Sequence, residues 1–337
     1  MSEPRIVDTH NDLLLELEYR RGEERPFERH WLPNLERGGV ALQVCPIFSA
    51  TLDWLPELAL RHNLQQVAAF RRAVTECSER VVEVRSRGDL DEVEAGTRIG
   101  LMLSMEGVEA LGYDPTLVDV FHDLGVRMVS LTWNRRNPFG DGAAEPAHGG
   151  LSNLGRALVD RMAGLGGIAI DLVHTSERTF WDIVEQSGSA PLVVSHAACR
   201  AVCETPRNLN DEQLKALAER GGVLGLMLLP IVIDPESWTM ERVLDHVDHA
   251  VSVMGIEHVG LGGDFIRQVW RALPMRAAPD SLLPGEMPMD AAIEGLAGPE
   301  DYPTLVEALR GRGYEGERLE AILGGNMFRL LRSSLPE

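Results

Sequence analysis

Six side chains in this sequence are of the types that bind divalent metal ions. They are His10, Asp12, Glu106, His174, His196 and Asp264. Imidazole nitrogens and carboxylate oxygens together form a common ligand set for zinc in proteins. In an extended strand, residues two apart point to the same face, so His10 and Asp12 could aim at one ion. A lone His-x-Asp pair occurs often by chance, so the other four residues carry the argument.

Each of these side chains comes at or just after the end of a short apolar run, and eight such runs are expected to be strands. They are Arg5–Thr9, Ala41–Phe48, Ile99–Ser104, Arg127–Thr132, Gly167–Val173, Pro191–Ser195, Gly222–Leu228 and His258–Gly262. The runs are apolar on both faces, which is typical of parallel strands covered by helices. Segments with helical period separate most of them: Pro56–Ser78, Asn153–Gly164, Ser176–Ser187, Asp211–Arg220 and Thr239–Met254.

Strands alternating with helices predict a single-domain (β/α)8 barrel over residues 1–337, with a doubly wound open sheet as the alternative. Ser152 and Ser176 are expected to cap helices, and residues 302–332 to form two helices on the outside. Asn326 is expected to cap the second of these, Met327–Arg332. Two long loops, Trp133–Gly150 and Arg271–Asp290, would lie over the barrel mouth.

In a parallel barrel the carboxyl ends of all strands meet at one rim, where barrel enzymes carry their catalytic groups. Three imidazoles and three carboxylates exceed the needs of one tetrahedral zinc, so two ions are expected, with Glu106 between them. Two such ions can hold a hydroxide and polarise a carbonyl, while Asp264 moves the proton to the leaving group. This chemistry is amide or ester hydrolysis. Zinc fits the mixed ligands first, with Mn, Co or Fe as alternatives.

The composition indicates an ordinary globular protein, with 44% hydrophobic residues and a net charge of −20. That negative field would repel a phosphate backbone, so nucleic acid is not an expected partner. The four cysteines are too few and scattered for a disulfide framework. No apolar run is long enough to span a bilayer, and the first residues lack a secretory pattern, so a cytoplasmic protein without membrane attachment is expected.

The ordered motifs resemble those of the membrane (renal) dipeptidase family, a branch of the amidohydrolase superfamily. They are Asp8-Thr9-His10-Asn11-Asp12-Leu13, Ser104-Met105-Glu106-Gly107, Asp171-Leu172-Val173-His174, Ser195-His196, Arg207-Asn208, Gly262-Gly263-Asp264-Phe265 and Gly324-Gly325-Asn326. The resemblance covers nearly the whole chain. It implies a barrel that hydrolyses dipeptides with two zinc ions, and it makes a homodimer possible.

The resemblance also implies a role for each matching residue. His10 and Asp12 would bind one zinc, His174 and His196 the other, and Glu106 would bridge them. Asp264 would be the proton-handling acid. Arg207 would grip the substrate's carboxylate at its C-terminus, a role that suits a bidentate guanidinium. Both L-Xaa-L-Xaa and L-Xaa-D-Xaa dipeptides are expected substrates.

Three residues near the expected pocket bear on the substrate range. The family often has histidine after the Leu-Thr of the fourth strand, whereas this chain has Trp133 and Asn134. Arg267 stands close after Asp264, and could favour an acidic substrate side chain. Because Trp133 supplies only an N–H donor, a lactone, a cyclic amide or an N-acyl amino acid remains an alternative substrate. A barrel that binds a peptide without cleaving it is the alternative from another class.

Overall fold

The computed structural model describes residues 5–49, 56–147, 149–273, 287–288 and 290–337, and its centre is a closed parallel barrel. The eight barrel strands are β1 (Ile6–Asp8), β2 (Val40–Phe48), β4 (Ile99–Glu106), β5 (Val126–Ser130), β6 (Ala169–Asp171), β7 (Leu192–Ala197), β8 (Val223–Met227) and β9 (Val259–Gly262). Pairing of β1 with β9 and of β2 with β4 closes the ring. The predicted barrel is confirmed, and the open-sheet alternative is wrong.

Every predicted strand overlaps an observed strand and differs from it by at most two residues at either end. The structure adds a ninth strand, β3 (Val81–Glu83), which pairs with the first residues of β4. Charged residues lie within and on both sides of β3, so it lacks the continuous apolar run by which the other strands were predicted.

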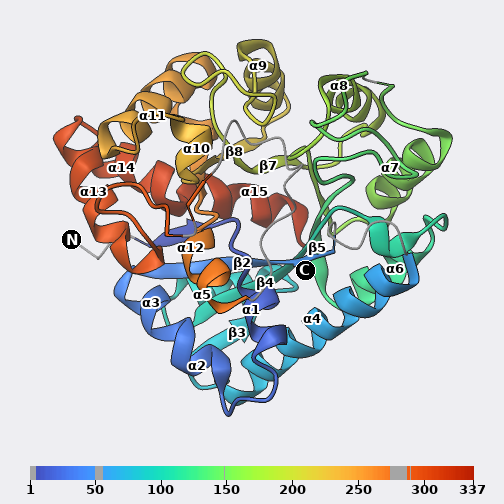
Figure 1. The fold of residues 1–337 in the computed structure, drawn as a ribbon, viewed down its shortest axis with the longest axis horizontal. Coiled ribbons are helices and arrows are strands. Elements are labelled where there is room, and N and C mark those ends of the chain that lie inside the picture. The colour runs from blue at the N-terminus through green and yellow to red at the C-terminus, as the bar shows by residue number, and fades with distance from the viewer. Residues whose placement is uncertain (1–4, 50–55, 148, 274–286, 289) are drawn as a thin grey trace.

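Helices surround the barrel, as Figure 1 shows. They are α1 (Leu13–Tyr19), α2 (Pro26–His30), α3 (Leu32–Arg37), α4 (Pro56–Glu76), α5 (Arg87–Glu94), α6 (Leu117–Asp123), α7 (Asn153–Leu165), α8 (Glu177–Gln186), α9 (Asp211–Glu219), α10 (Pro230–Ile233), α11 (Met240–Met254), α12 (Ile266–Ala272), α13 (Tyr302–Gly311), α14 (Gly316–Glu320) and α15 (Asn326–Ser334). The predicted caps are confirmed: Ser152 accepts a hydrogen bond from the Gly155 amide, and Ser176 from the Thr179 amide. No helix in the described ranges is both long and apolar enough to cross a membrane.

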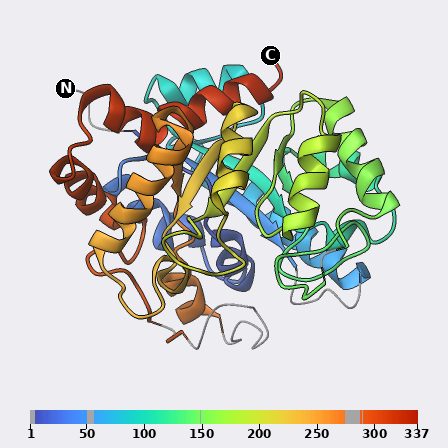
Figure 2. The same ribbon diagram turned by 90° about the horizontal axis from the view of Figure 1, so that it is seen from above.

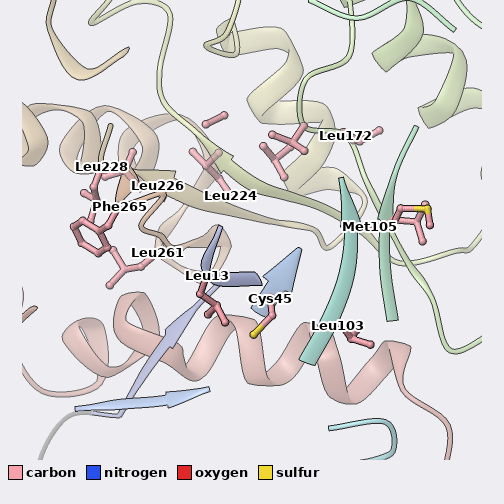
Figure 3. Packing of buried hydrophobic residues seen from close by; sticks show 14 of the residues in the cluster. Leu13, Cys45, Leu103, Met105, Leu172, Leu224, Leu226, Leu228, Leu261 and Phe265 are labelled. Carbon is pink, nitrogen blue, oxygen red and sulfur yellow. The ribbon is translucent and has the colours of Figure 1, made fainter. Parts of the chain in front are cut away.

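Alternate strand residues pack into two different clusters. One set packs with the surrounding helices, and Figure 3 shows part of it, including Leu103 of β4, Leu224 of β8 and Leu261 of β9. The other set, which includes Met102 and Val223, packs with Met327 of α15. Figure 2 shows α15 in red at one end of the barrel and α12 in orange at the opposite end. One end is therefore closed by a helix, and the other is left for the site.

The C-terminal part differs from the prediction in two ways. After α13, the chain stays helical from Gly316 to Ser334 through a π-helical turn at Ala321–Gly325, so the second helix begins well before the predicted Met327. Asn326 does not cap a helix. Its side-chain amide donates to the carbonyls of Ile256 and Val259, at 2.7 and 2.8 Å, and so holds the start of β9. Of the predicted Arg271–Asp290 loop, residues 274–286 and 289 lie outside the described residues.

Candidate active site

The six side chains predicted as ligands and proton carrier come together at the carboxyl end of the barrel. His10 and Asp12 follow β1, Glu106 ends β4, and His196 lies near the end of β7. His174 and Asp264 lie a few residues beyond β6 and β9. Because these strands are parallel and belong to one closed ring, their ends deliver the side chains to a single rim.

Three of the ligand atoms surround one point. Nε2 of His174 lies 2.8 Å from Oε1 of Glu106 and 3.0 Å from Nε2 of His196. Nε2 of His196 lies 3.4 Å from the same carboxylate oxygen. Two ligands of a tetrahedral zinc at its usual bond lengths lie about 3.3–3.6 Å apart, so these spacings are close to those of a metal site.

The other oxygen of Glu106 faces a second group. Oε2 of Glu106 lies 3.7 Å from Nε2 of His10, and that nitrogen lies 3.9 Å from Oδ1 of Asp12 and 3.9 Å from Oδ1 of Asp264. The ring of His10 also lies against that of His196, with centroids 3.6 Å apart. Glu106 is thus placed between two clusters, with one oxygen toward each.

These residues fit divalent cations because the protein alone leaves their charges unbalanced. Oδ1 of Asp12 is buried, and no described residue forms a hydrogen bond to it. Burial raises the pKa of Asp12 to about 7. Burial, reinforced by the neighbouring Asp12, raises the pKa of Asp264 to about 8. The pKa of Glu106 is also well above its ordinary value, first through burial. Bound cations would favour the charged forms of all three.

Two of these residues have an unusual backbone conformation. Among the described residues, three that are not glycine have positive φ, and His174 (61°) and Asp264 (49°) are two of them. This left-handed region is sparsely populated by residues with a side chain, and such strain is found most often at functional sites. The turns that follow β6 and β9 therefore have a strained backbone at the two residues whose side chains point to the rim.

A buried aspartate inside the barrel holds two of these turns together, and the sequence reasoning missed it. Asp8 accepts hydrogen bonds from the amides of His10 and Gly263, at 3.1 and 2.8 Å, and from the Tyr302 hydroxyl at 2.7 Å. Burial raises the pKa of Asp8 to about 6, and these bonds oppose the rise. The available signal was an acid at the end of a strand that is otherwise apolar.

Asp171 has the corresponding place between β6 and β7. It accepts from the amides of Val173 and Ser195, at 3.1 and 3.0 Å, and burial raises its pKa to about 6. The turn that carries His174 is thereby fixed to the strand that carries His196. Like Asp8, Asp171 is a polar residue at the end of an apolar strand, and it stands three residues before a predicted ligand.

Arg207 reaches the site from the loop between β7 and α9. Its side chain is only 4% exposed, and its Nη2 donates to the carbonyl of His196 at 2.9 Å. No carboxylate of the described residues lies within 4.0 Å of its guanidinium, although Asp264 and Glu106 act on it from further away. Burial lowers its pKa to about 10, so the group remains a cation at neutral pH.

The three remaining predicted residues have different surroundings. The centroid of the Trp133 ring lies 5.9 Å from that of His174 and 5.4 Å from that of Phe48, at the edge of the cluster of predicted ligands. Asn134 is buried, and its side chain bonds to His174. Arg267 lies on α12 and lines a cavity of about 410 Å³ with Arg20, Arg29, His30 and Arg271, none of which is a predicted ligand. Roles in substrate binding stay predictions for all three.

The raised pKa values predict how the metal-free protein responds to pH. The pKa of Asp264 is about 8, far above the ordinary 3.8, so the folded form retains a proton that the unfolded chain has lost. Stability of the metal-free protein should therefore fall as pH rises from about 6.5 to 8, by up to about 1.4 kcal/mol per pH unit for each such carboxyl group. The buried imidazoles have lowered pKa values, so they are neutral in the folded protein and still partly protonated in the unfolded chain at pH 6.5. They oppose the trend at the low end of this interval and contribute little toward pH 8.

Urea unfolding of chelator-treated protein at pH 6.5, 7.2 and 8 measures this slope. Protein reloaded with zinc is the control, and its stability should decline much less, since bound cations keep the carboxylates ionised. A metal-free protein that becomes more stable over this interval would contradict the assignment of buried, protonated carboxyl groups to this rim.

Comparison with known proteins identifies the family. Residues 1–273 match the model of the membrane dipeptidase family, peptidase family M19. Dipeptidase tcpJ of Claviceps purpurea is 31% identical over 83% of this chain, which spans 61% of that relative's length. Two solved structures, each 26% identical, cover almost all of both chains. One is a metallopeptidase of Rhodobacter sphaeroides with a phosphinate mimic of L-Ala-D-Ala, at a TM-score of 0.82, and the other is dipeptidase AC, at 0.85. The chain therefore belongs to the membrane dipeptidase family of metallopeptidases, as its motifs predicted.

Proposed function

We propose that this protein is a dipeptidase that binds two zinc ions at the barrel rim. His174 and His196 would hold one ion, His10 and Asp12 the other, and Glu106 would contact both. The two oxygens of Glu106 support this division, since they face Nε2 of His174 at 2.8 Å and Nε2 of His10 at 3.7 Å. Ions bound there would activate a water molecule and polarise the carbonyl that is attacked.

The observation that carries the substrate assignment is the buried guanidinium of Arg207. A buried cation without a carboxylate partner is costly in a folded protein, so a ligand that supplies one is strongly favoured. Arg207 can offer parallel N–H groups to the free carboxylate of a short peptide, which suits its planar geometry. A second residue of limited length would place the peptide bond next to the metal ligands, and this favours dipeptides.

Asp264 would carry the proton in the reaction. It lies 3.9 Å from Nε2 of His10 at the rim. Burial raises its pKa to about 8 in the metal-free protein, and bound cations would lower that value and favour the charged form that accepts a proton. It would take the proton from the attacking water and give it to the departing amine. No side chain need form a covalent bond to the substrate.

Two finer features belong to the same proposal. Cleavage of L-Xaa-D-Xaa dipeptides is supported by the Rhodobacter sphaeroides relative, whose structure contains a phosphinate mimic of L-Ala-D-Ala, and we propose L-Xaa-L-Xaa dipeptides as substrates as well. We also propose a cytoplasmic location, and a homodimer as the form in solution. The partly exposed Trp133 beside His174 would form one wall of the substrate pocket.

Purified protein loaded with zinc should cleave dipeptides in a panel that pairs L- and D-residues at the second position. We expect the same dipeptides with an amidated C-terminus to be cleaved much more slowly, because Arg207 would lose its carboxylate partner. The panel should also hold lactones, cyclic amides and N-acyl amino acids. Cleavage of those compounds with none of the dipeptides would favour the alternative amidohydrolase reaction and refute ours.

A further inference from the structure

The ring nitrogen of His174 that faces away from the metal cluster has a defined partner. Nδ1 of His174 lies 2.7 Å from Oδ1 of Asn134, and Asn134 is only 3% exposed. An amide oxygen can accept a hydrogen bond but cannot donate one, so Nδ1 must carry the hydrogen. Nε2 of the neutral ring then has a free lone pair directed at Glu106. Asn134 thus selects the tautomer that a metal ion requires.

His196 is held in the same tautomer by a relay of two groups. Its Nδ1 lies 2.9 Å from the Ser195 hydroxyl oxygen, which could either donate or accept. The hydroxyl also forms a hydrogen bond with the carboxylate of Asp171. Because a carboxylate only accepts, the hydroxyl hydrogen is used there, and the oxygen is left to accept from Nδ1–H of His196. The Nε2 lone pair again faces the cluster, so in these tautomers no hydrogen lies between the Nε2 atoms of His174 and His196, which are 3.0 Å apart, and a cation would relieve their repulsion.

The second cluster is not supported in this way. Within the described part of the chain, no hydrogen bond holds Nδ1 of His10, and Oδ1 of Asp12 has no hydrogen-bond partner. Its atoms are also further apart, at 3.7–3.9 Å from Nε2 of His10, whereas those around His174 and His196 are 2.8–3.4 Å apart. The imidazoles of one metal position are oriented by hydrogen bonds before an ion binds, whereas His10 in the other position is not.

We propose that Asn134 and the Ser195–Asp171 pair are positioning residues that make the His174–His196 position the tighter of the two, so that it fills first. This inference rests on the proposed two-metal site. Partners that orient a ligating histidine are typically worth 10–100-fold in metal affinity. The chain therefore has an ordered loading sequence, and a half-loaded form with its ion between His174, His196 and Glu106.

Titration of metal-free protein with Co²⁺, followed by calorimetry and by the visible absorption of the bound ion, tests the order of loading. We expect two steps in the wild type. Asn134→Ala should weaken the first step 10–100-fold and leave the second nearly unchanged. Asn134→Asp keeps an oxygen that accepts from Nδ1, so it should restore most of the first step. Ser195→Ala should weaken the first step in the same way, because it removes the partner of His196. It replaces Asn134→Ala in the test if that variant does not fold.

Asn137 provides the control, since it lies in the same loop and its side chain is hydrogen bonded but does not touch a ligand. Its side chain bonds to the Leu131 carbonyl and to the Phe139 amide. Asn137→Ala should leave both Co²⁺ steps unchanged. A first step weakened as much by Asn137→Ala as by Asn134→Ala would mean that loop order is responsible, and would overturn the proposal.

The tautomers can be observed directly by nitrogen NMR of the metal-free protein labelled at histidine. Wild-type protein should show Nδ1–H signals for His174 and His196, and the first should shift toward the Nε2–H form in Asn134→Ala. Unchanged tautomers together with unchanged Co²⁺ steps would refute the inference. Binding of a single Co²⁺ per wild-type chain would instead refute the two-metal proposal, so the two failures are distinguishable.

Discussion

Asp264→Asn is expected to lower kcat by about 10²–10⁴-fold, the contribution usual for a positioned acid–base group. Asparagine has the same shape and tolerates the left-handed backbone at φ 49°, so the turn after β9 should persist. The amide cannot accept and release a proton at neutral pH, whereas the carboxyl group of Asp264 can. The loss should therefore appear in kcat and not in folding.

Metal content measured by mass spectrometry separates the two roles that Asp264 could have. If it is the proton carrier, the variant should retain both ions and still bind a dipeptide mimic with nearly wild-type affinity. A variant that loses an ion would show that Asp264 acts mainly as a ligand. Its Oδ1 lies 3.9 Å from Nε2 of His10, so this second role is also consistent with its position. Asp264→Ala is the companion variant, because it removes both functions together.

Arg207→Met is expected to lower kcat/KM for dipeptides by about 10²-fold, since a bidentate charged contact is worth a few kcal/mol. Methionine keeps much of the apolar stem, while it removes the charge and the contact of Nη2 with the Met227 sulfur. Arg207→Lys keeps the charge but loses the forked geometry, so it should recover only part of the rate. Steady-state kinetics on one L-Xaa-L-Xaa dipeptide measures all three proteins.

The same dipeptide with an amidated C-terminus is the control for this prediction. Wild-type protein should cleave the amide as slowly as Arg207→Met cleaves the free acid. The kcat/KM of Arg207→Met should be only slightly lower for the amide than for the free acid. Equal losses on both substrates would show that Arg207 supports the site through its bond to the His196 carbonyl and does not read the substrate.

The barrel and the six rim residues were predictable because both follow from burial. A strand covered on both faces is a short apolar run, and a polar side chain that ends such a run is conspicuous. Glu106 and His196 were found in this way, at the ends of β4 and β7. Parallel strands of a barrel have their carboxyl ends on one rim, so the residues that end them are expected to lie close together even when no distance is known.

What escaped prediction depends on partners that are distant in the sequence. Asp8 and Tyr302 are 294 residues apart, and only the closed barrel shows that they share a hydrogen bond. The role of Asn326 was assigned from its place before an expected helix, but its partners lie on the chain before β9. Arg267 follows Asp264 closely, yet α12 carries it into another cavity, because a helix turns successive side chains to different sides.

The left-handed turn at Asp264 also limits how this enzyme can be altered by laboratory evolution. Few residues other than glycine adopt positive φ readily, and they are chiefly asparagine, aspartate and histidine. A saturated library at position 264 should therefore yield folded proteins mostly with these four residues, while valine or isoleucine would be recovered rarely. The backbone thus restricts the available chemistry before catalysis is selected. New activities on this barrel are easier to reach through residues 133–147, none of which has positive φ.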